Sequence, residues 1–346
     1  MSPNQHQPAL LAKDVTVSYH NSPQPVLDKV NLELQSGELL AVLGPSGCGK
    51  TTFLKAVAGL LPTASGTIEL AGRVVVDADT WLPPERRRVG LVPQDAALFP
   101  HLSVADNVKF GLKRHPDFRT KQQQRQRVED LLELVGVSSL AKRKPAELSG
   151  GQAQRVAVAR ALAPQPALVL LDEPFAALDA ALRARLRTDV AAILRQAGAS
   201  AVLVTHDQDE ALSMADRIAV FSEGRVVQCD RPNAVYAKPA TAWVAEFLGT
   251  CTINEAGQVL RPEQVRLEAA DDGARDASAT ADDAHATTHA TVTEVEFLGH
   301  STLYQVAVES GPWAGHTIGV RELGAIRFHP GQKVQALIPE QLHQLK

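Results

Sequence analysis

One stretch of sequence decides the fold of this chain: Gly44-Pro45-Ser46-Gly47-Cys48-Gly49-Lys50-Thr51. It follows residues 39–43, a solid apolar run of the kind that forms a buried parallel strand. It leads into residues 51–60, whose pattern predicts a helix ending near Gly59 or Pro62. A strand, a glycine-rich loop and a helix in this order predict a phosphate-binding loop, the P-loop.

The residue types in this loop suit a nucleotide phosphate chain. The glycines let successive backbone N–H groups face the phosphate oxygens, and a helix beginning near Gly49 adds its positive end. Lys50 is placed to reach the β- and γ-phosphates, and the Thr51 hydroxyl to bind Mg²⁺. A glycine-rich turn that binds nothing is the alternative. We expect nucleotide contacts from Gly44, Pro45, Ser46, Gly47, Cys48, Gly49, Lys50, Thr51 and Thr52.

Two carboxylates follow the apolar run at residues 168–171. Asp172 and Glu173 would therefore lie at the carboxyl end of a central strand, where such sheets bind their ligands. We expect Asp172 to hold Mg²⁺, directly or through water. We expect Glu173 to act as the general base that polarises the attacking water. The alternative is that both acids only cap the next helix.

Two further segments can contact phosphate. His206 follows the buried strand predicted at residues 201–205, where it could bond to the γ-phosphate, although a lone histidine is more often a solvated or capping residue. The string Leu148-Ser149-Gly150-Gly151-Gln152 places a good N-cap, Ser149, before two glycines at a helix start. This predicts either a second anion site or simply a capped helix.

The order of segments predicts an α/β core with a parallel sheet. Buried strands near 167–171 and 201–205 are separated by a helical stretch at 179–196, and residues of about 95–165 are mostly helical. We interpret that mostly helical region as a helical subdomain inserted into the core. Short β-like segments begin after residue 250, while residues 269–290, rich in Ala, Asp, Thr and Ser, predict a flexible loop.

Composition excludes several classes of protein. With a net charge of −4 there is no basic excess, so we expect no nucleic-acid partner. The 3 cysteines are too far apart to suggest a disulfide framework or a zinc site, which indicates a reducing compartment. The N-terminal residues lack the pattern of a signal peptide. The apolar runs are far shorter than the ~20 residues that span a bilayer, so any work at a membrane requires docking on another protein.

Taken in order, these motifs resemble ATP-binding cassette (ABC) proteins over residues 8–245. The matching elements are Tyr19 (aromatic loop), residues 44–51 (Walker A), Gln94 (Q-loop), 148–152 (signature), Asp172-Glu173 (Walker B), Asp179 within 177–179 (D-loop) and His206 (H-loop). The resemblance implies that ATP is bound and hydrolysed. It also implies that Tyr19 stacks on adenine and that Gln94 contacts Mg²⁺ and the attacking water.

The family resemblance also implies a second chain. Ser149, Gly150, Gly151 and Gln152, with Asp179, would contact ATP held by another copy of the protein. Two ATP molecules would then lie between two identical chains. The cassette would drive transmembrane permease subunits, and indirectly serve a solute-binding protein, from the cytoplasmic face of the bacterial inner membrane.

Residues 250–346 resemble the small β-rich regulatory (TOBE-like) domain of bacterial importers of sulfate, polyamine, sugar or iron. The likeness rests on 261–265 and 293–299, and stretches such as 83–88 and 98–102 look most like ferric-iron importer subunits. The expected fold is thus an α/β P-loop NTPase core of the ABC ATPase type, with a helical subdomain insert, plus a small all-β, OB-like C-terminal domain.

We expect an ATPase that energises solute import, with ferric iron as the favoured cargo and sulfate, polyamine, phosphonate or sugar as alternatives. A cassette ATPase of DNA repair or chromosome structure would need a long heptad insertion or zinc-type cysteines, and a translation-type cassette a second P-loop; the sequence has none of these. A GTPase or small-molecule kinase would leave the segment at 148–152 unexplained, and the guanine-binding signal Asn-Lys-x-Asp is missing.

Overall fold

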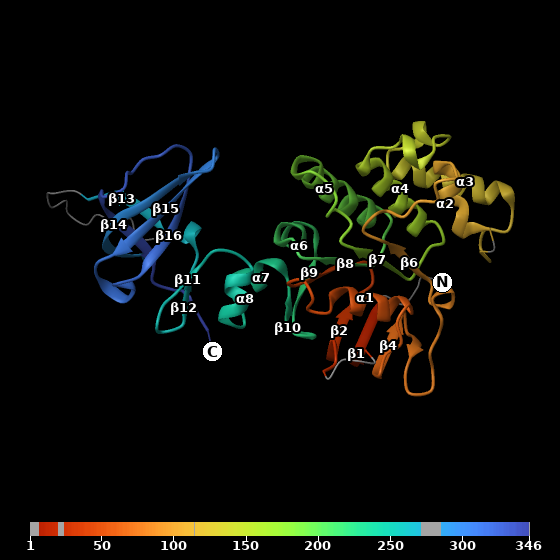
Figure 1. Ribbon diagram of the computed structural model, residues 1–346, viewed down its shortest axis with the longest axis horizontal. Helices are drawn as coiled ribbons and strands as arrows, with labels where there is room; N and C mark the ends of the chain where they lie inside the picture. The colour runs from red at the N-terminus through yellow and green to blue at the C-terminus, as the bar shows by residue number, and fades with distance from the viewer. Residues whose placement is uncertain (1–6, 20–23, 114, 271–284, 346) are drawn as a thin grey trace. The chain divides into compact units, whose positions relative to one another are not determined.

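The computed structural model describes residues 7–19, 24–113, 115–270 and 285–345 (Figure 1). By its internal contacts the chain divides into two compact units, Met1–Asn233 and Ala234–Lys346. The predicted domain limits, 8–245 and 250–346, stay a prediction, since residues 234–249 group by contacts with the second unit.

The first unit is built on a mainly parallel sheet, which confirms the predicted α/β core. Its strand order within the described residues is β10-β9-β3-β8-β7-β6, with only β10 antiparallel to its neighbour. The strands are β3 (Leu39–Leu43), β6 (Val89–Val92), β7 (Leu168–Asp172), β8 (Ala201–Thr205), β9 (Arg217–Ser222) and β10 (Arg225–Asp230). Strands β3, β7 and β8 are buried almost throughout, as their continuous apolar runs require.

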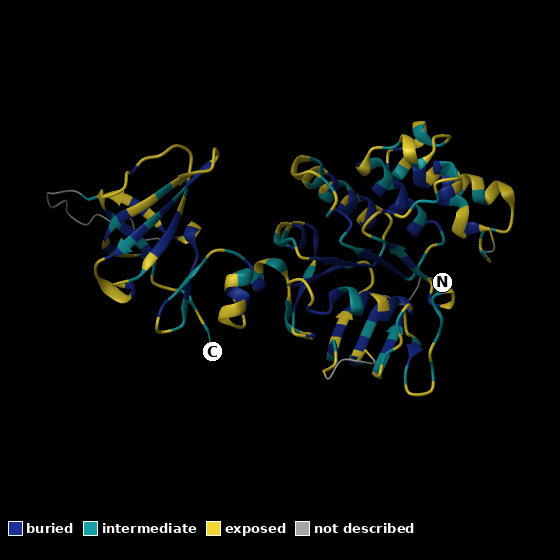
Figure 2. Ribbon diagram, viewed as in Figure 1, coloured by how far each residue is buried: buried dark blue, intermediate teal, exposed yellow. Residues whose placement is uncertain are grey.

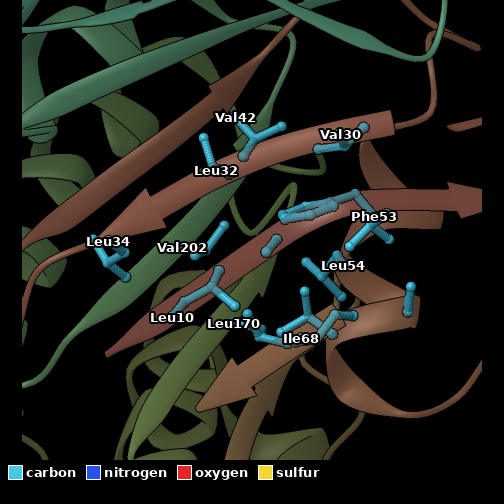
Figure 3. Packing of buried hydrophobic residues seen from close by; sticks show 14 of the residues in the cluster. Leu10, Val30, Leu32, Leu34, Val42, Phe53, Leu54, Ile68, Leu170 and Val202 are labelled. Atoms are coloured by element: carbon cyan, nitrogen blue, oxygen red, sulfur yellow. The ribbon is translucent and has the colours of Figure 1, made fainter. Parts of the chain in front are cut away.

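A second, antiparallel sheet packs on this core in the order β2-β1-β4-β5. Its strands are β1 (Leu10–Val17), β2 (Leu27–Leu34), β4 (Ser65–Leu70) and β5 (Arg73–Val76). Residues of β2 alternate between buried and exposed, because one face meets the core and the other meets solvent. Figure 3 shows Leu10 and Ile68 of this sheet gathered with Leu54 of helix α1 (Lys50–Ala58) and Leu170 of β7.

The predicted helical region contains α2 (Val104–Lys109), α3 (Lys121–Leu134) and α4 (Gly150–Leu162). Helix α3 begins with a capping box between Thr120 and Gln123 and ends at Gly136, whose φ is 69°. In Figure 2 it is largely exposed, whereas the strands of the parallel sheet are buried. Helices α5 (Ala180–Gln196) and α6 (Gln208–Met214) return the chain to the core. No helix in the described ranges is long and apolar enough to cross a bilayer.

The second unit begins with short helices and continues as strands, which confirms a β-rich C-terminal part. The helices are α7 (Pro232–Ala237) and α8 (Ala242–Phe247), and β11 (Thr252–Ile253), β12 (Gln258–Leu260) and β18 (His343–Gln344) form a small sheet. An antiparallel sheet of order β13-β17-β14-β15-β16 holds β13 (Arg266–Ala269), β14 (His285–Phe297), β15 (Ser301–Val308), β16 (Thr317–Leu323) and β17 (Lys333–Pro339). Tyr304, Trp313 and Phe328 lie in its core.

Strand β14 corrects the predicted loop at 269–290, because it already begins at His285. Its first residues pair with Pro339 and Ile338 of β17, so pairing with a neighbouring strand orders a segment poor in large apolar side chains. Residues 271–284 of the predicted loop lie outside the described ranges.

Arg261 explains why residues 234–249 group with the second unit. Its side chain is buried, and Nη1 donates to the carbonyls of Ala245 (2.9 Å) and Gly249 (2.8 Å). The guanidinium also lies 4.1 Å from the centre of the Tyr236 ring. Burial, and secondarily a hydrogen bond to Glu263, raise the pKa of Tyr236 to about 12, so its hydroxyl stays a donor. The Arg261 side chain therefore links α7 and α8 to the segment that follows β12.

Candidate active site

The P-loop joins β3 to α1, as the sequence predicts. Gly47 and Gly49 have φ of 82° and 104°, a left-handed region that favours glycine. A Cβ on Gly49 would also lie 2.9 Å from the carbonyl oxygen of Val26. Lys50 is buried, and its Nζ donates to the carbonyls of Gly44 and Pro45, each at 2.8 Å. The ammonium group thus lies within the curve of the loop.

The start of α1 is suited to an anion. Its N-cap, Gly49, provides no side-chain cap, so the first helical N–H groups and the positive end of the helix dipole face the loop. Thr51 and Thr52 lie in this first turn. Cys48 is buried beneath the loop, and burial raises the pKa of its thiol, which keeps it neutral beside Lys50.

Thr51 and Asp172 meet although 121 residues separate them. The Thr51 Oγ1 donates to the Asp172 Oδ1 at 3.2 Å. Burial, opposed by this hydrogen bond, raises the pKa of Asp172 above its usual value. A hydroxyl and a carboxylate are the hard oxygen ligands that Mg²⁺ prefers, so these residues fit that ion. Gln94 is exposed just after β6, and in the described ranges no hydrogen bond joins it to Thr51 or Asp172.

Glu173 and His206, each predicted as a site residue, lie close to each other. His206 Nδ1 lies 3.1 Å from Glu173 Oε2, so the ring orients the carboxylate. Glu173 has φ of 43°, a left-handed conformation that costs energy for a residue with a Cβ. Its N–H donates to the carbonyl of Val204 at 2.9 Å, which holds the strained residue beside the end of β8. The structure therefore brings together the base and the histidine predicted from sequence.

The signature segment forms a capping box at the start of α4. Ser149 Oγ accepts the N–H of Gln152 at 3.4 Å, and Gln152 Oε1 accepts the N–H of Ser149 at 3.0 Å. A Cβ on Gly150 would lie 2.9 Å from Leu178, and one on Gly151 2.9 Å from Leu186. A side chain at either position would therefore crowd the end of a leucine side chain, that of Leu178 before α5 or that of Leu186 within it.

Asp179 belongs to this second group of predicted site residues. It caps α5, with its Oδ1 accepting the N–H of Leu182 at 2.9 Å. Among the described residues, no hydrogen bond joins residues 148–152 or Asp179 to the P-loop of the same chain. Tyr19, predicted to stack on adenine, is 46% exposed and follows β1. A single chain thus carries two separate groups of predicted site residues.

The β9–β10 turn is a part of the site that the sequence analysis missed. The Gly224 N–H donates to the carbonyl of Cys48 at 3.1 Å, and the Gly224 carbonyl accepts the N–H of Asp28 at 3.0 Å. Arg225 bonds to the carboxylate of Asp28, with Nε at 3.0 Å. This turn therefore joins the P-loop, at Cys48, to strand β2, at Asp28. A glycine in a two-residue gap between two apolar runs is a hairpin signal that could have found it, although Glu-Gly is weaker than the usual Asn-Gly or Asp-Gly pair.

The comparisons with known proteins agree with this geometry. Residues 27–176 match the family model described as ABC transporter, and residues 259–343 match the TOBE domain. The "Fe(3+) ions import ATP-binding protein FbpC 2" of Rhodococcus jostii is 43% identical over 336 residues, covering 89% of this chain and 91% of that protein. The "Spermidine/putrescine import ATP-binding protein PotA" of Thermobifida fusca is 46% identical over 256 residues, covering 72% and 64%.

Two solved structures are similar to the chain. CbiO1 from Clostridium perfringens, described as part of the ABC transporter complex cbiONQ, has a TM-score of 0.60 and 28% identity, covering 67% of this chain and 92% of that one. The ATP-binding cassette MJ0796, solved as a dimer in a post-hydrolysis state with ADP and Pi, has a TM-score of 0.55 and 30% identity, covering 64% and 98%.

The fold and the P-loop site define a cassette ATPase, and the relatives give its family. The chain belongs to the ATP-binding subunits of ABC transporters, with a C-terminal TOBE domain. It is an ATPase whose hydrolysis of ATP is coupled to transport, of the importer type, as predicted. Of the two similar solved structures, one is a dimer and the other is part of an ABC transporter complex.

Proposed function

We propose that this chain is the ATPase of a ferric-iron importer, acting as a homodimer with Mg²⁺ and ATP. The observation that carries the proposal is likeness over nearly the whole chain to a ferric-iron import protein, at 43% identity over 89% of the residues. A second ferric-iron relative, from Pseudomonas fluorescens, is 41% identical over 90% of the chain. At 89% and 90% coverage, both alignments extend beyond the cassette into the C-terminal unit.

Polyamine import is the second candidate, because the Thermobifida fusca relative is 46% identical over the part that aligns. That alignment covers only 72% of this chain and 64% of the relative. The cassette performs the same ATP chemistry whatever the cargo, so identity within the cassette discriminates poorly between solutes. The longer ferric-iron alignment is therefore the better guide.

The residues of the site divide the hydrolysis reaction between them. The P-loop N–H groups and Lys50 bind the β- and γ-phosphates. Thr51 and Asp172 would hold Mg²⁺, which neutralises charge on the β- and γ-oxygens when bound. Glu173, oriented by His206, takes the proton of the water that attacks the γ-phosphorus, and ADP leaves with its β-phosphate oxygen. Tyr19 stacks on adenine.

The second group of site residues supports the dimer. Ser149 and Gly150 are exposed at the start of α4, where the first N–H groups of a helix lack an intrahelical acceptor, and this anion-binding arrangement is set apart from the P-loop of the same chain. Two copies facing each other would place this helix start of one chain at the γ-phosphate of the ATP bound to the other, with Asp179 at the same composite site. Gln94, exposed at the junction with the helical region, would sense Mg²⁺ and the water and pass the signal to the permease.

Cargo and location are tested together. The proposed complex lies at the cytoplasmic face of the bacterial inner membrane, with permease subunits bound directly and a solute-binding protein indirectly. We expect the chain to co-purify with its permease, and reconstituted vesicles to hydrolyse ATP faster when the binding protein carries ferric iron than when it is empty. Stimulation by a spermidine-loaded binding protein, and none by iron, would replace iron with polyamine.

A further inference from the structure

Arg183, near the start of α5, contacts two loops that carry different parts of the site. Its Nη2 donates to the carbonyl of Leu178 at 2.9 Å. Its Nη1 lies 3.5 Å from Oδ2 of Asp207. Both side chains of this ion pair are less than one-third exposed, at 30% and 23%, so solvent screens the pair only in part.

Each of these loops is tied to a residue of the predicted site. Leu178 precedes Asp179, the N-cap of α5, and approaches the position of Gly150 in the signature segment. Asp207 follows His206 directly and caps α6, with its Oδ1 accepting the N–H of Glu210 at 3.1 Å. Arg183 therefore links the loop of Asp179 to the loop of His206.

The charges around Asp207 hold this link in place. Arg187, one turn further along α5, has its Nη1 3.6 Å from Asp207 Oδ1. Helices α5 and α6 lie side by side (Figure 1), so both guanidinium groups reach the carboxylate from one helix. The N–H of Asp207 donates to Thr205 Oγ1 at 3.0 Å, which fixes its backbone.

We propose that Arg183 is a positioning residue that couples the Asp179 loop, and through it the signature segment, to His206 and Glu173. A displacement of the Asp179 loop moves the Leu178 carbonyl that Arg183 holds. The same guanidinium transmits the displacement to Asp207, and His206 is the next residue in the chain. This inference rests on the proposed function, because the partner chain's ATP is what would displace the Asp179 loop.

The test compares Arg183→Gln with Arg185→Gln in the full-length chain. Arg185 lies two positions along the same helix and is exposed, so its substitution controls for loss of one positive charge. We expect Arg183→Gln to lower kcat about tenfold, to leave the KM for ATP within about twofold, and to bring the Hill coefficient toward one. A merely structural role would reduce the folded fraction without changing the Hill coefficient.

A double-mutant cycle tests the path through Asp207. If Arg183 acts through that carboxylate, Arg183→Gln and Asp207→Asn together should cost little more than either alone. Fully additive effects, or an Arg183→Gln variant with wild-type kcat and Hill coefficient, overturn the proposal. If Arg183→Gln does not fold, the test uses Arg183→Lys instead. A single ammonium group cannot bond to both loops, so a normal Hill coefficient in the lysine variant also overturns the proposal. A wild-type chain without ATPase activity would instead count against the proposed function.

Discussion

Glu173 combines a predicted chemical role with a costly backbone conformation. Its φ of 43° is maintained by the bond from its N–H to Val204 and by the contact of its carboxylate with His206. Strained residues of this kind persist where the surroundings over-determine them, and they concentrate at functional sites. Its neighbour, Asp172, stays in register with Val204 of β8.

Glu173→Gln should abolish turnover without abolishing ATP binding. The amide keeps the size and a hydrogen bond to His206 but cannot take a proton, so we expect ATP hydrolysis to fall roughly 100- to 1,000-fold. Because ATP then persists, the dimer should accumulate under ATP, which size-exclusion chromatography with nucleotide measures. Glu255→Gln is the control for loss of one carboxylate, since Glu255 is exposed and lies in the second unit. Normal hydrolysis by the Glu173 variant would show that another group is the base.

Part of the site follows from sequence because parallel strands end at one edge of a sheet. That rule predicts that Asp172, Glu173 and His206 meet the P-loop, and the structure brings Thr51 to Asp172 and His206 to Glu173. Their chemical roles stay predictions. Arg183 could not be predicted in the same way, because its two partners lie on a loop and a helix start whose approach depends on how α5 and α6 pack.

The β9–β10 turn acts on the P-loop as an element rather than through a catalytic side chain. Gly224 has φ of 75°, and a Cβ there would lie 2.5 Å from the carbonyl oxygen of Val26. The turn cannot accept a side chain at this position unless it moves away from β2. Such a movement would withdraw the N–H that bonds to Cys48 in the loop.

Gly224→Ala should therefore weaken ATP binding. We expect the Kd for ATP to rise about tenfold, equivalent to ~1.4 kcal/mol, because the backbone of the loop loses its support. Gly198→Ala is the control: Gly198 has φ of 61° and nothing within 4 Å of an added Cβ. Both variants carry the left-handed alanine cost of about 1–2 kcal/mol in stability. Equal ATP affinities in the two variants, measured by nucleotide titration, would show that the turn does not set the loop.

Elements with continuous apolar runs were predictable, and amphipathic hairpins were less so. Strands β3, β7 and β8 are buried on both faces, so their composition alone indicates them. The β4–β5 hairpin and strand β10 were not predicted, since half-exposed strands carry a weaker pattern. Strand β9 was also missed, although its four middle residues form a buried apolar run. The first residues of β14 were predicted as a loop, because Ala, Thr and His do not form the apolar pattern of a strand. These residues are ordered by pairing with β17.

At the scale of the whole molecule, each compact unit has its own core. One apolar cluster joins the two sheets of the first unit around Phe53 and Phe221, and another fills the β-rich unit around Tyr304 and Trp313. Units with separate cores commonly fold on their own.

Removal of residues 250–346 should leave a folded chain that binds ATP. We expect the Kd for ATP of residues 1–249 to stay within about threefold of the full chain, a change below ~1 kcal/mol. The helices α7 and α8 should become sensitive to limited proteolysis, because Arg261 no longer binds their carbonyls. Residues 1–233 provide the comparison without these helices. Complete loss of nucleotide binding in both would show that the first unit depends on the second for folding.

The buried Arg261 also bears on how such proteins diversify by recombination. If two related genes recombine between residues 234 and 249, Arg261 comes from one parent and part of α7 and α8 from the other. The buried guanidinium then meets carbonyl groups that did not evolve with it. A breakpoint before Ala234 transfers the arginine and its acceptors as one inheritable block. Viable chimaeras that exchange the C-terminal unit between related importers should therefore carry their junctions ahead of α7, even though the change in composition lies some residues later.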